Sequence, residues 1–227
     1  MAIAFDSTSG AQTGWTTSNS FSHTCSGSDR LLLVWVYFDR GAGAYYTSAL
    51  TYNGSALTQV GTFTVGTAGY GELWALVNPA SGTNTLSATY SNAGPTAKVA
   101  IRALSYNGVN QTTAYGTLAT SAGTSTTATV NVTSATDELV VSGVVSNEGG
   151  VTLTVGADQT QRYIVHQLGG GGVWSAIFSD EPGAATTTAS AGLNSSLAWG
   201  IAALPLKPLT TDSGVPKTTK LTLLGVG

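Results

Sequence analysis

The stretch DRLLLVWVYF, which begins at Asp29, decides the fold because DELVVSGVVS, which begins at Asp137, repeats its pattern later in the chain. Each stretch opens with acidic or other charged residues and continues as a run of apolar residues. The longest apolar run, residues 31–38, is too short to cross a bilayer. Short runs of this kind are typical of buried core strands. The two stretches therefore predict two equivalent core strands in one chain.

The rest of the chain carries strand signals at the spacing of an all-β protein. No stretch repeats apolar residues at helical intervals over several turns, and Thr, Val and Gly are frequent. Turn-forming sequences such as NG at Asn53, SNAGP at Ser91 and DEPG at Asp180 separate the runs. We predict an antiparallel, jelly-roll-like β-sandwich with strands near residues 3–6, 20–25, 30–38, 47–52, 56–64, 71–78, 84–90, 97–106, 115–121, 126–132, 137–146, 151–155, 159–166, 172–179, 184–191 and 197–206.

The two sets of strands also align with each other. GELWALVNPASGTNTLSATYS matches GGVWSAIFSDEPGAATTTASA, which places Trp74 against Trp174, and KVAIRALSYNG from Lys98 matches LAWGIAALPLK from Leu197. We interpret residues 1–208 as an internal duplication with repeats of about 1–108 and 109–208. The repeats could form one large sandwich or two small ones. One compact unit is favoured, because no linker of domain-joining length separates them.

The composition excludes several classes of partner. Charged residues make up only 8% of the chain, with eight Lys and Arg and a net charge of −3, so no basic stripe for nucleic acid or an anionic membrane can form. The surface must instead consist of Thr, Ser, Gly, Asn and Ala, which suits packing in a large assembly or contact with sugars. The N-terminal sequence MAIAFDSTSG shows no secretory signal, and we expect synthesis in a cytoplasm and use wherever the protein is assembled.

Residues that could carry chemistry are few. His23 and Cys25 lie two residues apart on one strand face, which is a weak metal pattern, and we expect His23 and His166 to be structural. Asp29 and Asp137 occupy equivalent positions just before a core strand, which favours solubility over catalysis. No nucleophile elbow, phosphate loop or calcium loop is present. We expect no enzymatic activity and no cofactor or metal.

Aromatic residues near loops allow two interpretations. Exposed rings hold carbohydrate in sugar-binding sandwiches, but Tyr and Trp are also enriched in turn packing and at interfaces, which we favour here. The tryptophans inside predicted strands, Trp35, Trp74, Trp174 and Trp199, are expected in the core. The residues with this double interpretation are Trp15, Tyr45, Tyr46 and Tyr70.

The segment 209–227 has no counterpart in the first repeat. Pro208 and Pro216 disfavour helix there, and the alternating Leu and Thr of TKLTLLGVG favour an extended arm over a solvated tail. An extended arm can pair with an exposed strand edge of a neighbouring subunit. The residues predicted to bind that partner are Lys217, Lys220, Leu221, Leu223 and Leu224.

The chain also resembles a known family over residues 3–208. The ordered phrases GSDRLLLVWV, ALTYNGSALTQVG, GELWALVNPASGTNTLSATYS, ALSYNGVNQTT, DELVVSGVV, DQTQR and AWGIAALPLKP resemble a repeat-built β-sandwich protein of tailed-phage virions and large bacterial surface proteins. The resemblance implies a capsid cement (decoration) protein, often a homotrimer, on the outer surface of the virion against the major capsid protein. It brings no catalytic residues. The alternative class is a carbohydrate- or receptor-binding module of a phage tail or fibre.

Overall fold

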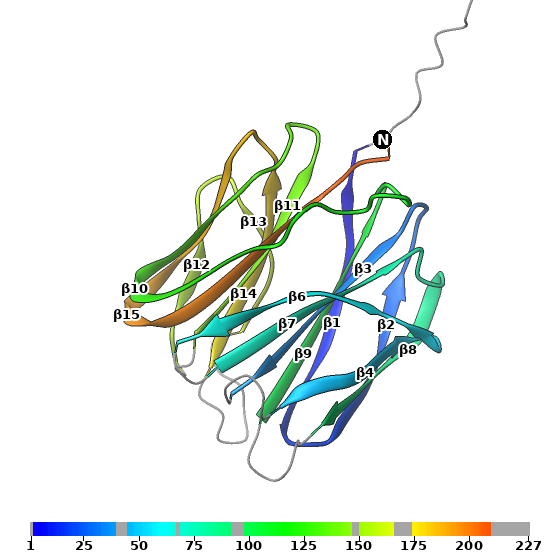
Figure 1. Cartoon of the computed structure of the whole chain (residues 1–227), viewed down its shortest axis with the longest axis horizontal. Coiled ribbons are helices and arrows are strands. Elements are labelled where there is room, and N and C mark those ends of the chain that lie inside the picture. The colour runs from blue at the N-terminus through cyan, green and yellow to red at the C-terminus, as the bar shows by residue number, and fades with distance from the viewer. Residues whose placement is uncertain are drawn as a thin grey trace, which may run out of the picture.

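The computed structural model describes residues 2–39, 45–66, 69–91, 98–146, 150–165 and 174–209, and of residues 12–15 the backbone alone. Within these ranges every regular element is a strand and the strands pair antiparallel (Figure 1), which confirms the predicted all-β, sandwich-like fold. Of the predicted arm, only Leu209 belongs to the described part. The predicted partner-binding residues of the arm lie outside it, and they are Lys217, Lys220, Leu221, Leu223 and Leu224.

The first half of the chain forms two sheets. The inner sheet has the order β1-β9-β3-β7-β6, and the outer sheet has the order β2-β8-β4-β5. β1 runs well beyond the predicted 3–6 because it pairs along the whole of β9. The strands are β1 (Ala4–Trp15), β2 (Ser18–Cys25), β3 (Leu31–Phe38), β4 (Tyr46–Tyr52), β5 (Ser55–Ala56), β6 (Thr58–Val65), β7 (Gly69–Val77), β8 (Gly82–Ser91) and β9 (Lys98–Asn107).

The second half uses two long strands in place of four short ones. β10 pairs with β15 twice, residues 119–125 with 197–203 and residues 127–132 with 187–192, with an irregularity between the two segments. Each predicted pair of strands is therefore one strand that bends from one layer into the next. The strands are β10 (Ala119–Val132), β11 (Leu139–Ser146), β12 (Leu153–Val155), β13 (Thr160–Val165), β14 (Ser175–Pro182) and β15 (Thr187–Leu206).

The described strands of the two halves follow the same order. The inner sheet of the second half reads β10-β15-β11-β14-β13, which matches β1-β9-β3-β7-β6, and β10-β15-β12 matches the outer β2-β8-β4. The registers fix equivalent positions. Leu31 lies opposite Tyr106 and Val77, and Leu139 lies opposite Leu206 and Pro182. The last strand of each half, β9 or β15, thus lies between its first strand and its central strand.

These registers correct the alignment made from sequence. Because Val77 corresponds to Pro182, Trp74 corresponds to Ser179 and not to Trp174. The predicted match of Lys98 with Leu197 is also wrong. Val99 and Trp199 pair with equivalent residues of the central strands, so Lys98 corresponds to Ala198. A shift of one residue along a strand turns every side chain to the opposite face, so this correction decides which residues are equivalent in the cores.

Three hydrophobic cores stack through the molecule. The central core lies between the two inner sheets, and each half has a further core between its inner and outer layers. β3 serves two of them, because Leu33 and Trp35 face the central core while Val34 and Val36 face the core of the first half. All eight residues of β3 are buried, which explains why its sequence is continuously apolar.

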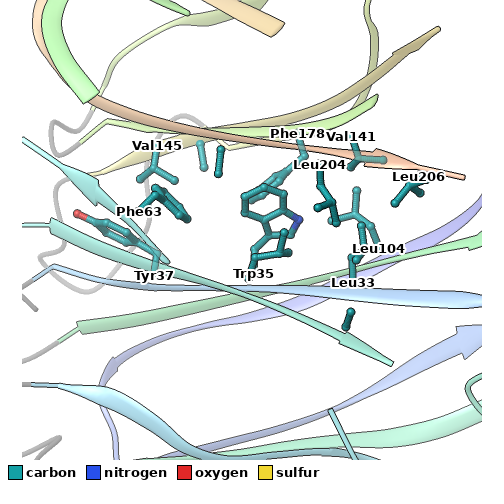
Figure 2. Close-up of a cluster of buried hydrophobic side chains, with 14 of the residues drawn as sticks. Leu33, Trp35, Tyr37, Phe63, Leu104, Val141, Val145, Phe178, Leu204 and Leu206 are labelled. Carbon is teal, nitrogen blue, oxygen red and sulfur yellow. The ribbon is translucent and has the colours of Figure 1, made fainter. Parts of the chain in front are cut away.

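Trp35 occupies the middle of the central core (Figure 2). Its ring packs edge-on against Phe63 of β6 and Phe178 of β14, with centroids 5.9 and 5.5 Å apart. Gly143 of β11 leaves room for it, since a Cβ there would lie 3.1 Å from the indole. Trp174 and Trp199 are buried as expected, whereas Trp74 is half-buried against the core of the first half.

Polar contacts also join the halves. Arg162 of β13 donates two hydrogen bonds to Asp180, from Nε at 2.7 Å and from Nη2 at 2.9 Å, and the Tyr106 hydroxyl of β9 donates to the same carboxylate. The Arg102 guanidinium of β9 lies 3.4 Å from the centre of the Tyr163 ring of β13. Burial first, and then the charge and hydrogen bond of Asp180, hold the pKa of Tyr106 well above its usual range.

The contacts between the halves are reciprocal. β13 of the second half meets β9 of the first, and β6 of the first half, the equivalent of β13, meets β15 of the second. The second contact is close, since a Cβ on Gly200 would lie 2.1 Å from the Thr64 carbonyl oxygen. In a two-fold-symmetric dimer, an element of one subunit contacts its partner in the same way as the equivalent element of the other subunit does. The two halves of this chain contact each other in that way within one chain.

Candidate functional site

The aromatic candidates do not share one environment. Tyr46 is 46% exposed at the start of β4. Tyr45 and Tyr70 are half-buried and pack against the core of the first half, where Tyr70 stacks on Phe38. The side chain of Trp15 lies outside the described residues. Within the described part of the chain, only Tyr46 therefore offers a large exposed ring, and the interpretation of this group as a sugar platform stays a prediction.

His23 lies at the centre of a polar cluster between β1, β2 and β9. It is 1% exposed, and its ring nitrogens lie 2.7 Å from Ser9 Oγ and 3.5 Å from Ser7 Oγ. Ser7 Oγ lies 3.1 Å from Ser105 Oγ, which donates to Asp6 at 2.8 Å. The cluster combines serine, histidine and aspartate, which are also the residue types of hydrolytic triads.

The electrostatics of this cluster are unsuited to catalysis. Burial lowers the pKa of His23 to about 4, although the charge of Asp6 acts in the opposite direction, so the imidazole is a weak base. Burial alone would raise the pKa of Asp6, but hydrogen bonds from Ser26 and Ser105 lower it overall. A serine hydrolase needs a base that titrates near neutral pH and a carboxylate on the imidazole. We interpret the cluster as a clasp that joins three strands, in line with the structural role expected for His23. His166 lies outside the described residues.

Cys25 is fully buried close to this cluster. Burial raises the pKa of its thiol, which disfavours the reactive thiolate. Across the described ranges, His, Cys, Asp and Glu side chains form no group of three or more that could hold a metal ion.

A polar cleft of about 760 Å³ opens at the outer corner of the second half. It lies between the turn after β12, the end of β14 and the first residues of β15. The sequence DEPG predicts a turn at Asp180 and Glu181. This was wrong, because both residues belong to β14, where they pair with β11. The cleft is lined by Ala157, Asp158, Glu181, Pro182, Gly183, Ala184, Thr186, Thr187, Thr188 and Ser190.

Glu181 is the unusual residue of this cleft. Its side chain is 7% exposed, and Oε1 has no hydrogen-bond partner. Burial, and secondly the charge of Asp158, raise the pKa of Glu181 to about 7. Asp158 itself is exposed, at a positive φ of 61° in the turn that forms the cleft wall. Near neutral pH, the carboxyl group of Glu181 is therefore partly protonated, and it lies beside a second acidic side chain in the cleft.

Comparisons with protein-family models, with curated proteins and with solved structures found no match for the chain. Among the residues described here, no helix is long and apolar enough to cross a membrane.

Proposed function

We propose that the protein is a non-enzymatic structural component of a tailed-phage virion, a cement protein that clamps neighbouring capsid subunits on the outer surface of the head. The observation that supports this role most directly is where the charged side chains make their contacts. Among the residues that the structure describes, most charged side chains make contacts within the molecule, and the exposed positions are mainly occupied by small polar residues. Protein interfaces are depleted in charge at their centres, so a surface of this kind suits permanent contact over a wide area.

The inward use of charge recurs through both halves. Arg30 donates to the carbonyl oxygens of Pro79 and Gly27, and Asp39 accepts from the Lys98 backbone. Further charged residues of the described part that make contacts inside the molecule include Asp6, Glu72, Arg102, Glu138, Arg162 and Asp180. These bonds stiffen the molecule without presenting charge that a partner would have to desolvate.

β10 supplies a suitable contact edge. It is an edge strand of its sheet, it contains no charged residue, and its outward side chains include Thr120, Thr124 and Thr129. Long uncharged edges are uncommon in proteins that remain alone in solution, because they offer backbone groups to a neighbour. The proposed neighbours are the major capsid protein and further copies of the chain in a homotrimer. The arm from Leu209 onward would add a second attachment.

The test is occupancy of the shell. Virions that lack the gene should bind the purified protein until the number of bound copies is close to the number of capsid subunits. The decorated virions should then resist heating better. Truncation after Pro208 should leave circular dichroism unchanged but lower the occupancy or the stability of the trimer. Immunogold labelling of the native particle should cover the head. A handful of copies at the tail, or absence from virions, would overturn the proposal.

Tyr46 favours a second candidate, a carbohydrate- or receptor-binding module of a tail or fibre. An exposed aromatic ring on a polar strand surface is the chemistry that holds sugar rings. A glycan array tests this function, with Tyr46→Ala as the matched variant. Selective binding that disappears in the variant would support it over the capsid role.

A further inference from the structure

The two halves differ chemically at one equivalent position. Glu181 of β14 corresponds to Leu76 of β7, because their strands pair in matching registers with β11 and β3. Leu76 packs against the core of the first half. At the same place, the second half has a carboxyl group. β12 spans only three residues where β4 spans seven, and this shorter outer layer coincides with the polar cleft.

The carboxyl group of Glu181 lacks the bonds that normally accompany burial. Buried polar groups nearly always have a hydrogen-bond partner, and an unpaired one costs free energy that leucine at this place would avoid. Oε1 of Glu181 has no partner, while Ser179, two residues earlier on the same strand, donates to Gln159. The free bonding capacity therefore lies at the cleft, where a ligand can use it.

The charge of the cleft determines the kind of ligand. Asp158 is the charged group that faces Glu181, and the lining contains no other titratable side chain among the described residues. No Lys or Arg of the described lining neutralises the two acids. A cationic group between them would remove their mutual repulsion and bond the unpaired oxygen through a charge-assisted hydrogen bond.

The size and walls of the cleft narrow the choice further. A volume of about 760 Å³ is in the range of sites for organic ligands, and Ala157, Pro182 and Ala184 offer apolar contacts to an aliphatic chain. A guanidinium group is planar, forms paired hydrogen bonds with carboxylates and is more weakly hydrated than an ammonium group. We propose that this cleft binds a guanidinium group on an aliphatic stem, as in an arginine side chain, with Glu181 and Asp158 as its two acceptors.

The probe is arginine blocked at both ends, N-acetyl-arginine amide, titrated into the full chain and followed by NMR. Signals of the cleft residues should shift and saturate. The citrulline derivative has the same shape without the charge and should produce no saturable shift. Free arginine distinguishes the source of the ligand, because a site for side chains binds the blocked compound at least as well, whereas a site for the free amino acid prefers arginine itself.

Variants test the two acceptors. Glu181→Gln should weaken binding at least about tenfold, because the ligand loses a buried charge partner. Asp158→Asn, at an exposed position, should weaken it only about two- to fivefold. Asp29→Asn removes the same charge at a distant turn and should bind like the original protein. Since Glu181 binds the cation in its ionised form, affinity should rise about tenfold from pH 6 to pH 8, and this dependence should disappear in Glu181→Gln.

Glu181→Leu provides a second check, because leucine is the residue of the first half. This variant should remain folded by circular dichroism and should not bind the probe. Equal binding of the citrulline derivative, unchanged affinity in Glu181→Gln, or saturable shifts at the cleft with CaCl2 but not with the arginine derivative would overturn the proposal. None of these outcomes depends on whether the protein occupies a capsid.

Discussion

The two halves of the chain share a strand order, but burial shifts the pKa of a histidine in the first half and that of a glutamate in the second half in opposite directions. The first half buries a base, His23, between β1, β2 and β9, while the second buries an acid, Glu181, at the end of β14. Burial lowers the pKa of His23 to about 4 and raises the pKa of Glu181 to about 7. In both halves burial therefore favours the neutral form of the side chain. Acid destabilises the first half through His23, whereas base destabilises the second half through Glu181, although the strand order is the same.

This difference shows which part of the fold tolerates change. The inner sheets meet each other and keep matching strand orders, because a change in one disturbs the central core of both halves. The outer layers face solvent on one side and have diverged from four strands to three segments. The cleft beside Glu181 accordingly lies where the outer layer of the second half is shortened to the three residues of β12.

The largest effect is expected when the two halves of the chain are separated. A fragment ending at Val109 would expose the central core, including Leu33, Trp35 and Leu104, which are each at most 3% exposed in the whole protein. We expect no folded monomeric fragment, and we expect a single thermal transition for the full chain. Calorimetry and gel filtration provide the measurements. A soluble, monomeric fragment with native circular dichroism would show that the halves are independent domains.

The next test removes the carboxylate shared by the halves. Asp180→Ala introduces the residue that occupies the equivalent position, Ala75, in the first half. It leaves Arg162 and the buried Tyr106 hydroxyl without their acceptor, so stability should fall by about 3–5 kcal/mol. Urea denaturation measures the loss. The exposed Asp137→Ala is the control and should change stability by less than about 0.5 kcal/mol. A similar value for both variants would contradict the shared role of Asp180.

His23 predicts how the first half responds to acid. Its folded pKa of about 4 lies below the ordinary value of 6.5, so between these values the unfolded chain binds more protons than the folded one. Stability should therefore fall as the pH is lowered from 6.5 to 4, by on the order of 3 kcal/mol. Denaturation at several pH values checks this. His23→Gln should flatten the dependence in this window, and an unchanged slope would contradict the prediction.

The central core permits a milder test at Gly143. In Gly143→Ala, the new Cβ would lie 2.9 Å from the Phe178 ring and 3.1 Å from Trp35. Such crowding typically costs about 1–3 kcal/mol. Combination with Trp35→Phe should recover part of this loss, because the smaller ring makes room for the methyl group. A double-mutant cycle by denaturation measures the coupling, and strict additivity would show that the contact is unimportant.

The sequence was a good guide to the fold where signals are local. The apolar runs after Asp29 and Asp137 occupy equivalent central strands, because burial on both faces requires continuous apolar sequence. It failed where tertiary pairing overrides local composition. DEPG resembles a turn, but pairing with β11 keeps Asp180 and Glu181 within β14. The match of Trp74 with Trp174 rested on residue identity, which carries no information about register.

The candidate sites were less accessible from sequence for the same reason. The His23 cluster joins Ser7 to Ser105, which lie 98 positions apart in the chain, and no local motif relates them. The cleft depends on the shortness of β12, which the expected strand at 151–155 did not reveal. Glu181 stands where the first repeat has a leucine, and this difference would have pointed to the cleft. It becomes visible only when the two repeats are aligned in the correct register.

The smallest expected effect concerns stability in Glu181→Leu. In the original protein, the folded pKa of about 7 lies above the ordinary 4.5, so the folded chain holds the proton longer and loses stability as the pH rises through this window. Leucine removes both the titration and the unpaired oxygen. The variant should therefore gain on the order of 1 kcal/mol over the original protein at pH 8, and less at pH 5. Denaturation at these two pH values decides it. Glu181→Gln controls for titration alone, because it keeps a polar group in the same space. A gain in stability that is equal at both pH values would contradict the prediction. It would show that the effect comes from packing and that titration of Glu181 does not contribute to stability.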